Sequence, residues 1–436
     1  MIKIFSADDP ALEQHLTRHP AGQEEAAARV REILSGVRES GDQALCRYMA
    51  LFDGVTLTPG ELKVKPEEIQ EAKDRVEESF LEDLAVAARN ITAYHRRQLS
   101  GSWMEPDAGG LLVGQLVRPL SRVGIYVPGG TAAYPSSVLM NALPARVAGV
   151  KEIVMVTPPN REGKISPYIL AAASVAGVTE IYRVGGAQAI AALAYGTQTI
   201  RPVDKIVGPG NLYVTLAKQQ VFGLVDIDML AGPSEVLVIA DDTADPRYVA
   251  ADMLSQAEHD TLARAMLLTP DQRLAQSVRE ELERQLGVLP RREIAASSLA
   301  SHGAIILTRD IAQAVDLANS IAPEHLELMV REPFSWLGCI TSAGAVFLGT
   351  YASEPLGDYL AGPSHVLPTG GTARFYSPLG VDAFLKRISV ISCSRDAFLK
   401  MAPSVIRLAR VEGLDAHARA IEVRLGGACR GSENNE

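Results

Sequence analysis

Short apolar runs and amphipathic stretches alternate along the chain from about Ser121 to Asp242. Apolar runs of roughly four to eight residues that end in Gly or Pro are typical of buried strands, whereas apolar positions that recur every three or four residues predict helices. Their alternation predicts βαβ units and a parallel, doubly wound sheet. The predicted strands lie in RVGIYVPGG, EIVMVTPP, EIYRVGG, DKIVGPGN and SEVLVIADD, with a helix between each and the next.

A second series follows the first with the same rhythm. It predicts helices over 245–259, 270–286 and 310–321, and the caps at Asp245 and Asp310 support the first and the last of them. The two series could be a duplication, but their sequences are too dissimilar to establish one. The predicted strands of this series lie in RAMLLTP, AIILT, LELMV and GAVFLG.

The segments outside the two series have other patterns. Residues 1 to about 100 are predicted to be mainly helical. A stretch rich in Gly and Pro, 349–380, shows no periodic element. The apolar positions from DAFLKRISVI onward predict a helical tail, and the polar end, 427–436, is expected to be disordered.

Composition narrows the class of protein. A chain of 436 residues with 47% hydrophobic residues can build two or more domains. The net charge of −10 and the lack of basic runs with aromatic residues argue against nucleic-acid binding. We expect no signal peptide, because MIKIFSADDP contains acidic residues and proline before any apolar h-region forms. We also expect no membrane span, because no apolar run approaches the roughly 18 residues that a span requires. Scattered cysteines without CxxC spacing predict free thiols in a reduced cytoplasm: Cys46, Cys339, Cys393 and Cys429.

Two segments hold polar residues that could bind a metal. Gln256 and His259 are three residues apart, so on a helix they would lie about one turn from each other. They could be metal ligands or a solvated helix edge. Asp358 and His365 lie in the Gly- and Pro-rich stretch, which could be a functional loop or a plain surface excursion.

Two further pairs contain a glutamate and a histidine. Glu412 and His417 stand near the start of the last predicted helix, where they could serve a site or form a solvated face. Glu324 and His325 are adjacent in IAPEHLEL, after Pro323 ends a predicted helix and before a predicted strand. Neighbouring side chains of a strand face opposite ways, so both could serve one pocket only in a turn, such as the turn at Pro323.

Glycine-rich turns follow three strands of the first series, in YVPGG, RVGGAQAI and VGPGN. Backbone N–H groups of such turns, followed by a helix N-terminus, can hold phosphate, although tight turns alone would also explain the glycines. The G-x-G-x-x-G motif and the acidic residue about 20 positions later are absent, so a dinucleotide would bind in a non-standard way. A metal, a base and a nucleotide together suggest an oxidoreductase.

Several long strings resemble the histidinol dehydrogenase family, and they occur in that family's order over nearly the whole chain. The resemblance implies NAD-dependent oxidation of L-histidinol to L-histidine through the aldehyde, with two hydride transfers and one zinc ion per subunit. The strings are VGIYVPGG, VGGAQAIAALAYGT, DKIVGPGN, DMLAGPSEVLVIAD, LSQAEHD, IAPEHLEL, GDYLAGPSHVLPTGGTARF and GLDAHARAIEVRL.

The resemblance also implies roles for individual residues. Glu324 and His325 match the family's pair of catalytic bases. The positions that contact the substrate are Ser234, His325 and Glu412, together with the four metal-ligand positions that are named at the end of this paragraph. The NAD-contact positions in the three glycine-rich turns are Tyr126, Gln188 and Asn211. The metal-ligand positions are Gln256, His259, Asp358 and His417.

The implied architecture is α/β, with two incomplete Rossmann-like, doubly wound domains and helical extensions at both ends. Residues 1–21 would form the N-terminal helical extension. The main domain, which carries the metal and the catalytic residues, would be discontinuous, with 22–125 and 235–379, and 126–234 would be the inserted NAD-binding domain. The tail, 380–436, would complete the site of the partner in a cytoplasmic homodimer.

The residues fit this chemistry. Neutral Gln and His ligands with one Asp would leave zinc electron-poor and open to the imidazole and amine of histidinol. His325 could take the hydroxyl proton, and Glu324 could activate water for the second oxidation. No cysteine lies in the matched motifs, which argues against a covalent thioester. A family member that oxidises another small primary alcohol is the alternative, with Ser234 and Glu412 the residues expected to distinguish the substrates.

Overall fold

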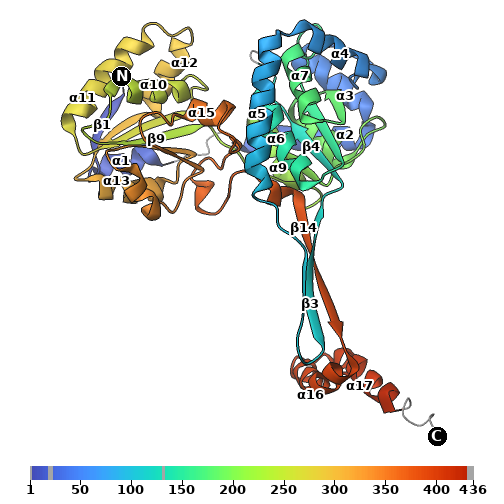
Figure 1. Ribbon diagram of the computed structural model, residues 1–436. Coiled ribbons are helices and arrows are strands. Elements are labelled where there is room, and N and C mark those ends of the chain that lie inside the picture. The colour runs from blue at the N-terminus through green and yellow to red at the C-terminus, as the bar shows by residue number, and fades with distance from the viewer. Residues whose placement is uncertain (1, 18–22, 130–132, 430–436) are drawn as a thin grey trace. The chain divides into compact units, whose positions relative to one another are not determined.

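The computed structural model describes residues 2–17, 23–129 and 133–429 of the chain (Figure 1). It divides into two compact units, residues 1–99 with 120–384 and residues 100–119 with 385–436. Most of the end that was expected to be disordered, from residue 430 on, lies outside the described residues. None of the described helices is long and apolar enough to cross a membrane.

Four of the five strands predicted for the first series, together with the short strand β8, form a five-stranded parallel sheet in the order β6-β5-β4-β7-β8. The fifth predicted strand, in SEVLVIADD, is β9 (Glu235–Ala240) and belongs to the other sheet. The strands are almost entirely buried, because helices cover both faces: α6 packs with α7, and α8 packs with α9. The elements are β4 Arg122–Tyr126, α6 Pro135–Ala148, β5 Glu152–Thr157, α7 Pro167–Ala176, β6 Glu180–Arg183, α8 Gly186–Tyr195, β7 Lys205–Val207, α9 Leu212–Val221 and β8 Asp226–Ile227.

The second series forms a six-stranded sheet in the order β1-β11-β10-β9-β12-β13, and every pair in it is parallel. When β1 is left out, the order of this sheet is β11-β10-β9-β12-β13, which is equivalent to the order β6-β5-β4-β7-β8 of the first sheet. In both sheets the first strand in chain order lies in the middle. The α/β class that we expected is therefore confirmed. The strands are β1 Lys3–Ser6, β9 Glu235–Ala240, β10 Arg264–Thr269, β11 Ala304–Leu307, β12 His325–Met329 and β13 Ala345–Leu348.

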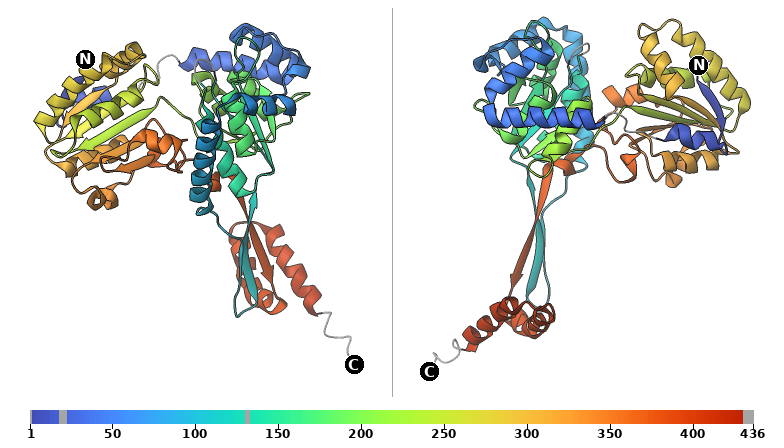
Figure 2. Two further views of the ribbon diagram at one scale, coloured as in Figure 1. Left: turned by 45° about the horizontal axis from the view of Figure 1, so that its top comes forward. Right: turned by 180° about the vertical axis from the view of Figure 1, so that it is seen from behind.

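Helices flank this second sheet as well (Figure 2). The side chains of Asp245 and Asp310 accept backbone N–H groups at the starts of α10 and α13, as predicted. Three helices of this region were not predicted from the sequence: α12, the short α14, and α15 in the stretch without periodicity. The helices are α1 Pro10–Leu16, α10 Pro246–Ala257, α11 Gln272–Leu286, α12 Arg292–Ser301, α13 Ile311–Ile321, α14 Pro333–Trp336 and α15 Glu354–Tyr359.

The N-terminal helices pack on the five-stranded sheet, where α2 contacts α8 and α9, α4 contacts α7, and α5 contacts α6. This differs from the expected grouping of 22–125 with 235–379, because the apolar face of α2 shares one core with α8 and α9. The N-terminal extension differs too, since β1 joins the second sheet. The segments are α2 Gln23–Ser40, α3 Asp42–Tyr48, the π-helix Met49–Asp53, the 3-10 helix Pro59–Glu61, α4 Pro66–Arg75 and α5 Glu78–Arg96.

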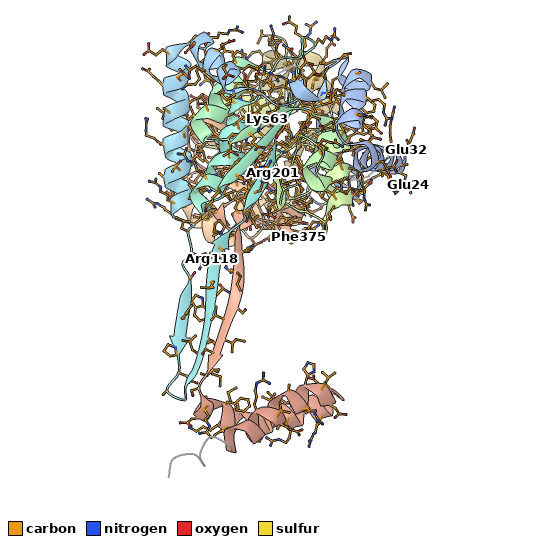
Figure 3. The ribbon with its side chains drawn as sticks, turned by 90° about the vertical axis from the view of Figure 1, so that its right-hand side faces the viewer. Glu24, Glu32, Lys63, Arg118, Arg201 and Phe375 are labelled. Atoms are coloured by element: carbon orange, nitrogen blue, oxygen red, sulfur yellow. The ribbon has the colours of Figure 1, made fainter. Side chains whose placement is uncertain are left out.

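The second unit combines an antiparallel three-stranded sheet, β14-β3-β2, with two helices. The tail was expected to be helical throughout, yet all nine residues of β14 pair with β3. Side chains on these strands are largely exposed (Figure 3), so no burial pattern marked them as strands in the sequence. The elements are β2 Trp103–Pro106, β3 Leu111–Pro119, β14 Leu385–Cys393, α16 Arg395–Val411 and α17 Asp415–Cys429.

Candidate active site

The adjacent pair Glu324 and His325 lies where α13 ends and β12 begins. Ala322 caps α13 in the left-handed conformation, with φ of 52°. This conformation is uncommon for a residue with a side chain, and together with Pro323 it turns the chain sharply into β12. Both Glu324 and His325 are buried, with 6% and 4% of their surface exposed. The turn inferred from Pro323 is therefore present.

Both side chains are held by the backbone of one residue, Glu235, at the start of the neighbouring strand β9. The N–H of Glu235 donates to Glu324 Oε2 at 2.9 Å, and Nδ1 of His325 lies 2.9 Å from the Glu235 carbonyl oxygen. A carbonyl can only accept, so Nδ1 carries the proton of the neutral imidazole. Nε2 of His325 is then the basic nitrogen, and it is buried without a hydrogen-bond partner among the described residues.

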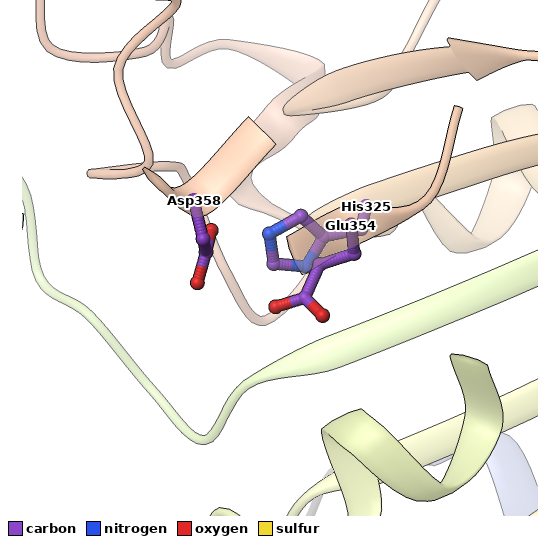
Figure 4. Close-up of side chains that lie close together, drawn as sticks. All are labelled: His325, Glu354 and Asp358. Carbon is purple, nitrogen blue, oxygen red and sulfur yellow. The ribbon is translucent and has the colours of Figure 1, made fainter. Parts of the chain in front are cut away.

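His325, Glu354 and Asp358 form a tight cluster (Figure 4), with one potential ligand atom from each lying within 4.8 Å of the others. Both carboxylates come from the short helix α15, where a spacing of four residues places them on one face. Asp358 was a candidate from the sequence, whereas Glu354 was missed. The E-x-x-x-D spacing after Ser353 was the available signal, but it required a helix in a stretch without periodicity.

Burial dominates the electrostatics of this cluster. Burial, reinforced by the charge of Glu354, raises the pKa of Asp358 to about 8, and burial also raises the pKa of Glu324 well above its usual range. Burial lowers the pKa of His325 and lowers that of His365 to about 4, so both imidazoles are neutral at pH 7. Among the groups that shift the pKa of Asp358, the described chain contributes no lysine or arginine. A cation bound at this cluster would offset the burial of these carboxyl groups and favour their ionised forms.

The helix α10 brings Gln256 and His259 to the same end of the sheet. Gln256 is 1% exposed, and its Oε1 has no hydrogen-bond partner among the described residues. The neighbouring Ser255 donates its hydroxyl to Glu354 Oε2 at 3.1 Å and so joins α10 to α15. His259 lies beyond the C-cap rather than on the helix as expected, and its charge lowers the pKa of His325.

A cavity of about 830 Å³ opens beside the cluster. His325, Asp358 and His365 line it, and the aromatic ring of Phe347 lies 6.0 Å from the ring of His325. Ser234 is half-buried and immediately precedes Glu235, the residue that contacts both Glu324 and His325. The first unit therefore contains five of the seven predicted substrate and metal residues, and of these five His325 and Asp358 belong to the close cluster.

Two predicted residues, Glu412 and His417, belong to the second unit. Glu412 is the C-cap of α16, and His417 lies in the first turn of α17. Both side chains are exposed in that unit. Large apolar side chains beside them are exposed as well, with Leu408, Val411 and Val423 at 65%, 86% and 58%.

A second cavity, of about 790 Å³, lies at the carboxyl ends of the strands in the five-stranded sheet. The three predicted cofactor residues, Tyr126 at the end of β4, Gln188 in α8 and Asn211 at the N-cap of α9, all line it. The Tyr126 hydroxyl accepts the N–H of Gly186 at 3.1 Å. Residues of the N-terminal helices also line the cavity, and no motif in the sequence marked them as site residues.

The strand order explains the position of this second cavity. The connections leave β4 toward β5 on one side, and β7 lies on the other side of β4, so the order reverses between β4 and β7. Ligands of open α/β sheets bind at such a reversal, beyond the carboxyl ends of the strands. By contrast, Glu324, His325 and Glu235 lie at the amino ends of β12 and β9 in the other sheet.

Comparisons with known proteins place the chain in a family. The family model described as Histidinol dehydrogenase matches residues 16–425. A histidinol dehydrogenase of Moorella thermoacetica is 63% identical over 401 residues, covering 92% of this chain and 95% of that protein. One of Heliobacterium mobile is 53% identical, covering 98% and 100%. The crystal structure of histidinol dehydrogenase from Elizabethkingia anophelis matches with a TM-score of 0.93 and 38% identity, covering 98% of each chain. The chain belongs to the histidinol dehydrogenase family.

Proposed function

We propose that this enzyme oxidises L-histidinol to L-histidine through L-histidinaldehyde and reduces two NAD molecules. The observation that supports this most strongly is the buried, unpartnered Nε2 of His325 beside two carboxylates, in a chain of this family. An alcohol oxidation needs such a base where the hydroxyl proton is released. The experiment is NADH formation from L-histidinol: we expect two NADH per substrate, and one NADH per substrate would overturn the four-electron reaction.

The residues of the first unit fit a zinc ion. Gln256 Oε1 is buried without a described partner, and the carboxyl of Asp358 is buried beside a second carboxyl without a described cation. Oxygen and imidazole donors suit zinc, so Gln256, His259 and Asp358 would hold it, with His417 as the fourth ligand. When bound, zinc would supply a Lewis acid that coordinates the imidazole and amine of the substrate.

Metal removal tests this assignment. We expect a chelator to abolish NADH formation, and added zinc to restore it. The measurement is the initial rate after dialysis against the chelator, with metal content determined by elemental analysis. Full activity in a sample that contains no metal would contradict the assignment.

His325 would remove the hydroxyl proton as the hydride leaves the carbinol carbon. The Glu235 carbonyl fixes the tautomer, so the lone pair of Nε2 faces the cluster with Glu354 and Asp358. A lowered pKa keeps this imidazole neutral and therefore able to accept a proton at pH 7. Among the described residues no cysteine lines either cavity, so a thiol nucleophile has no place in the route.

Glu324 would act in the second oxidation, in which water must add to the aldehyde. Burial raises its pKa, so its carboxylate is a stronger base than a solvated one. We expect Glu324→Gln to lower aldehyde oxidation by about 100-fold or more, the usual contribution of a general base, and to leave alcohol oxidation nearly unchanged. The amide oxygen can still accept the Glu235 N–H, so the fold should be kept.

The measurement for Glu324→Gln is the rate of each half-reaction, with histidinol and with histidinaldehyde supplied separately. His325→Asn is the matched comparison, because it should impair alcohol oxidation. Equal losses in both half-reactions of Glu324→Gln would contradict the division of roles.

NAD would bind in the second cavity, at the reversal between β4 and β7, with contacts to Tyr126, Gln188 and Asn211. The enzyme would be a homodimer in which Glu412 and His417 of one subunit complete the site of the other. Exposed apolar side chains next to these two residues support docking of this tail on a second copy.

A further inference from the structure

One wall of the cofactor cavity comes from the N-terminal helices, through Arg29 of α2 and through Phe52 and Asp53 of the π-helix Met49–Asp53. The Phe52 ring stacks on Tyr48 with ring centroids 5.7 Å apart, and the Arg29 guanidinium lies over the same ring at 5.9 Å. Gly54 ends the π-helix in the left-handed conformation, with φ of 67°. These contacts fix the turn that presents Asp53 to the cavity.

The carboxylate of Asp53 lacks a partner that its burial requires. Its Oδ2 is buried and has no hydrogen-bond partner among the described residues. A buried acceptor without a donor is costly, so such an atom points to a ligand that donates to it. Tyr126, a predicted NAD contact, is near enough that the charge of Asp53 adds to burial in raising the pKa of its phenol to about 12.

The chemistry of dinucleotide sites identifies the missing donor. In sheets with this strand order, an acidic residue near the end of the second strand accepts hydrogen bonds from the hydroxyls of the adenosine ribose. Here the second strand is β5, and the residues after it that line the cavity are Pro158, Pro159, Asn160 and Arg161, none of which is acidic. Among the cavity-lining residues of the inserted series, none supplies the carboxylate expected at this place.

We propose that Asp53, supplied by the N-terminal helices, takes this role: it binds the ribose hydroxyls of NAD and rejects the 2′-phosphate of NADP. The inference rests on the proposed binding of NAD in this cavity. A carboxylate accepts hydrogen bonds from both hydroxyls, whereas it repels a phosphate group at the same position. The arginines of the cavity, Arg29 and Arg161, would otherwise favour that phosphate.

The test is calorimetric titration of the folded protein with NAD and with NADP, which needs no turnover. We expect Asp53→Ala to weaken NAD binding by about 10- to 100-fold, as for a lost hydrogen bond to a charged group. Asp53→Asn keeps a hydrogen-bonding side chain and loses the charge, so its binding of NADP should strengthen relative to NAD by about 10-fold or more. Asp83→Asn, which removes an exposed carboxylate from α5, should keep wild-type affinity for both.

Asn211→Ala tests whether NAD binds in this cavity, independently of the role of Asp53. Melting temperatures show whether each variant is folded. If Asn211→Ala weakens NAD binding while both Asp53 variants bind NAD and NADP as the wild type does, the role of Asp53 is wrong. If neither Asn211→Ala nor Asp53→Ala changes NAD binding, the cavity is not the NAD site, and the proposed cofactor site fails together with the role of Asp53.

Discussion

Replacing Asp358 by alanine is expected to abolish zinc retention and to lower histidinol oxidation by more than about 100-fold. This loss exceeds the loss of about 10- to 100-fold that follows when a residue hydrogen-bonded to a metal ligand is removed. The reason is that Asp358 would be the only charged ligand among Gln256, His259, Asp358 and His417. The other predicted ligands are an amide and two imidazoles, none of which can supply a negative charge in its place.

The same substitution should leave the metal-free protein as stable as the wild type, or more stable. Burial and Glu354 raise the pKa of Asp358 to about 8, which means that ionising this carboxyl opposes folding at neutral pH when no cation is bound. Zinc should therefore raise the melting temperature of the wild type, because it binds only the folded state, and should leave that of Asp358→Ala unchanged.

The measurements are elemental analysis and melting temperatures with and without zinc, and Asp83→Ala serves as the control for loss of an exposed carboxylate. Glu354→Gln extends the test, because Glu354 clusters with Asp358 but was not among the predicted ligands. One full metal equivalent in Asp358→Ala would rule Asp358 out as a ligand. A loss of metal in Glu354→Gln as large as in Asp358→Ala would add Glu354 to the ligand set.

The sequence predicted those features that local chemistry determines. Most strands of both series are buried on both faces, so their apolar runs indicate them in the sequence, whereas the two-residue strand β8 was not predicted. The turn that places the side chains of Glu324 and His325 next to each other follows from Pro323, whose ring ends α13. The caps at Asp245 and Asp310 form as expected, because they depend only on residues two or three positions away.

Features that depend on distant partners could not be predicted. Glu354 belongs to the cluster because α15 folds against Ser255 of α10. Asp53 reaches the second cavity because α2 shares its apolar core with α8 and α9. The strand β14 forms because β3 pairs along its whole length, while its exposed side chains carry no burial signal.

The second large effect concerns the sharing of the active site between two chains. His417→Ala and His259→Ala homodimers are each expected to be nearly inactive, because each variant lacks one metal ligand in every site. The two ligands would come from different subunits: His259 follows α10 in the first unit, whereas His417 lies exposed on α17 in the second. The exposed Leu408, Val411 and Val423 near His417 would be covered by the partner.

Co-expression of the two variants distinguishes sharing from action within one chain. If pairing is random, half of the dimers are mixed. If the site is shared, the two-fold symmetry gives each mixed dimer one site with both defects and one intact site. Activity should therefore return to about a quarter of the wild type. Separate affinity tags allow the mixed dimers to be isolated, and zinc content should rise in the same fraction, to one equivalent per mixed dimer. If isolated mixed dimers stay inactive and hold no zinc, both ligands of a site come from the same chain, because each site then keeps one defect.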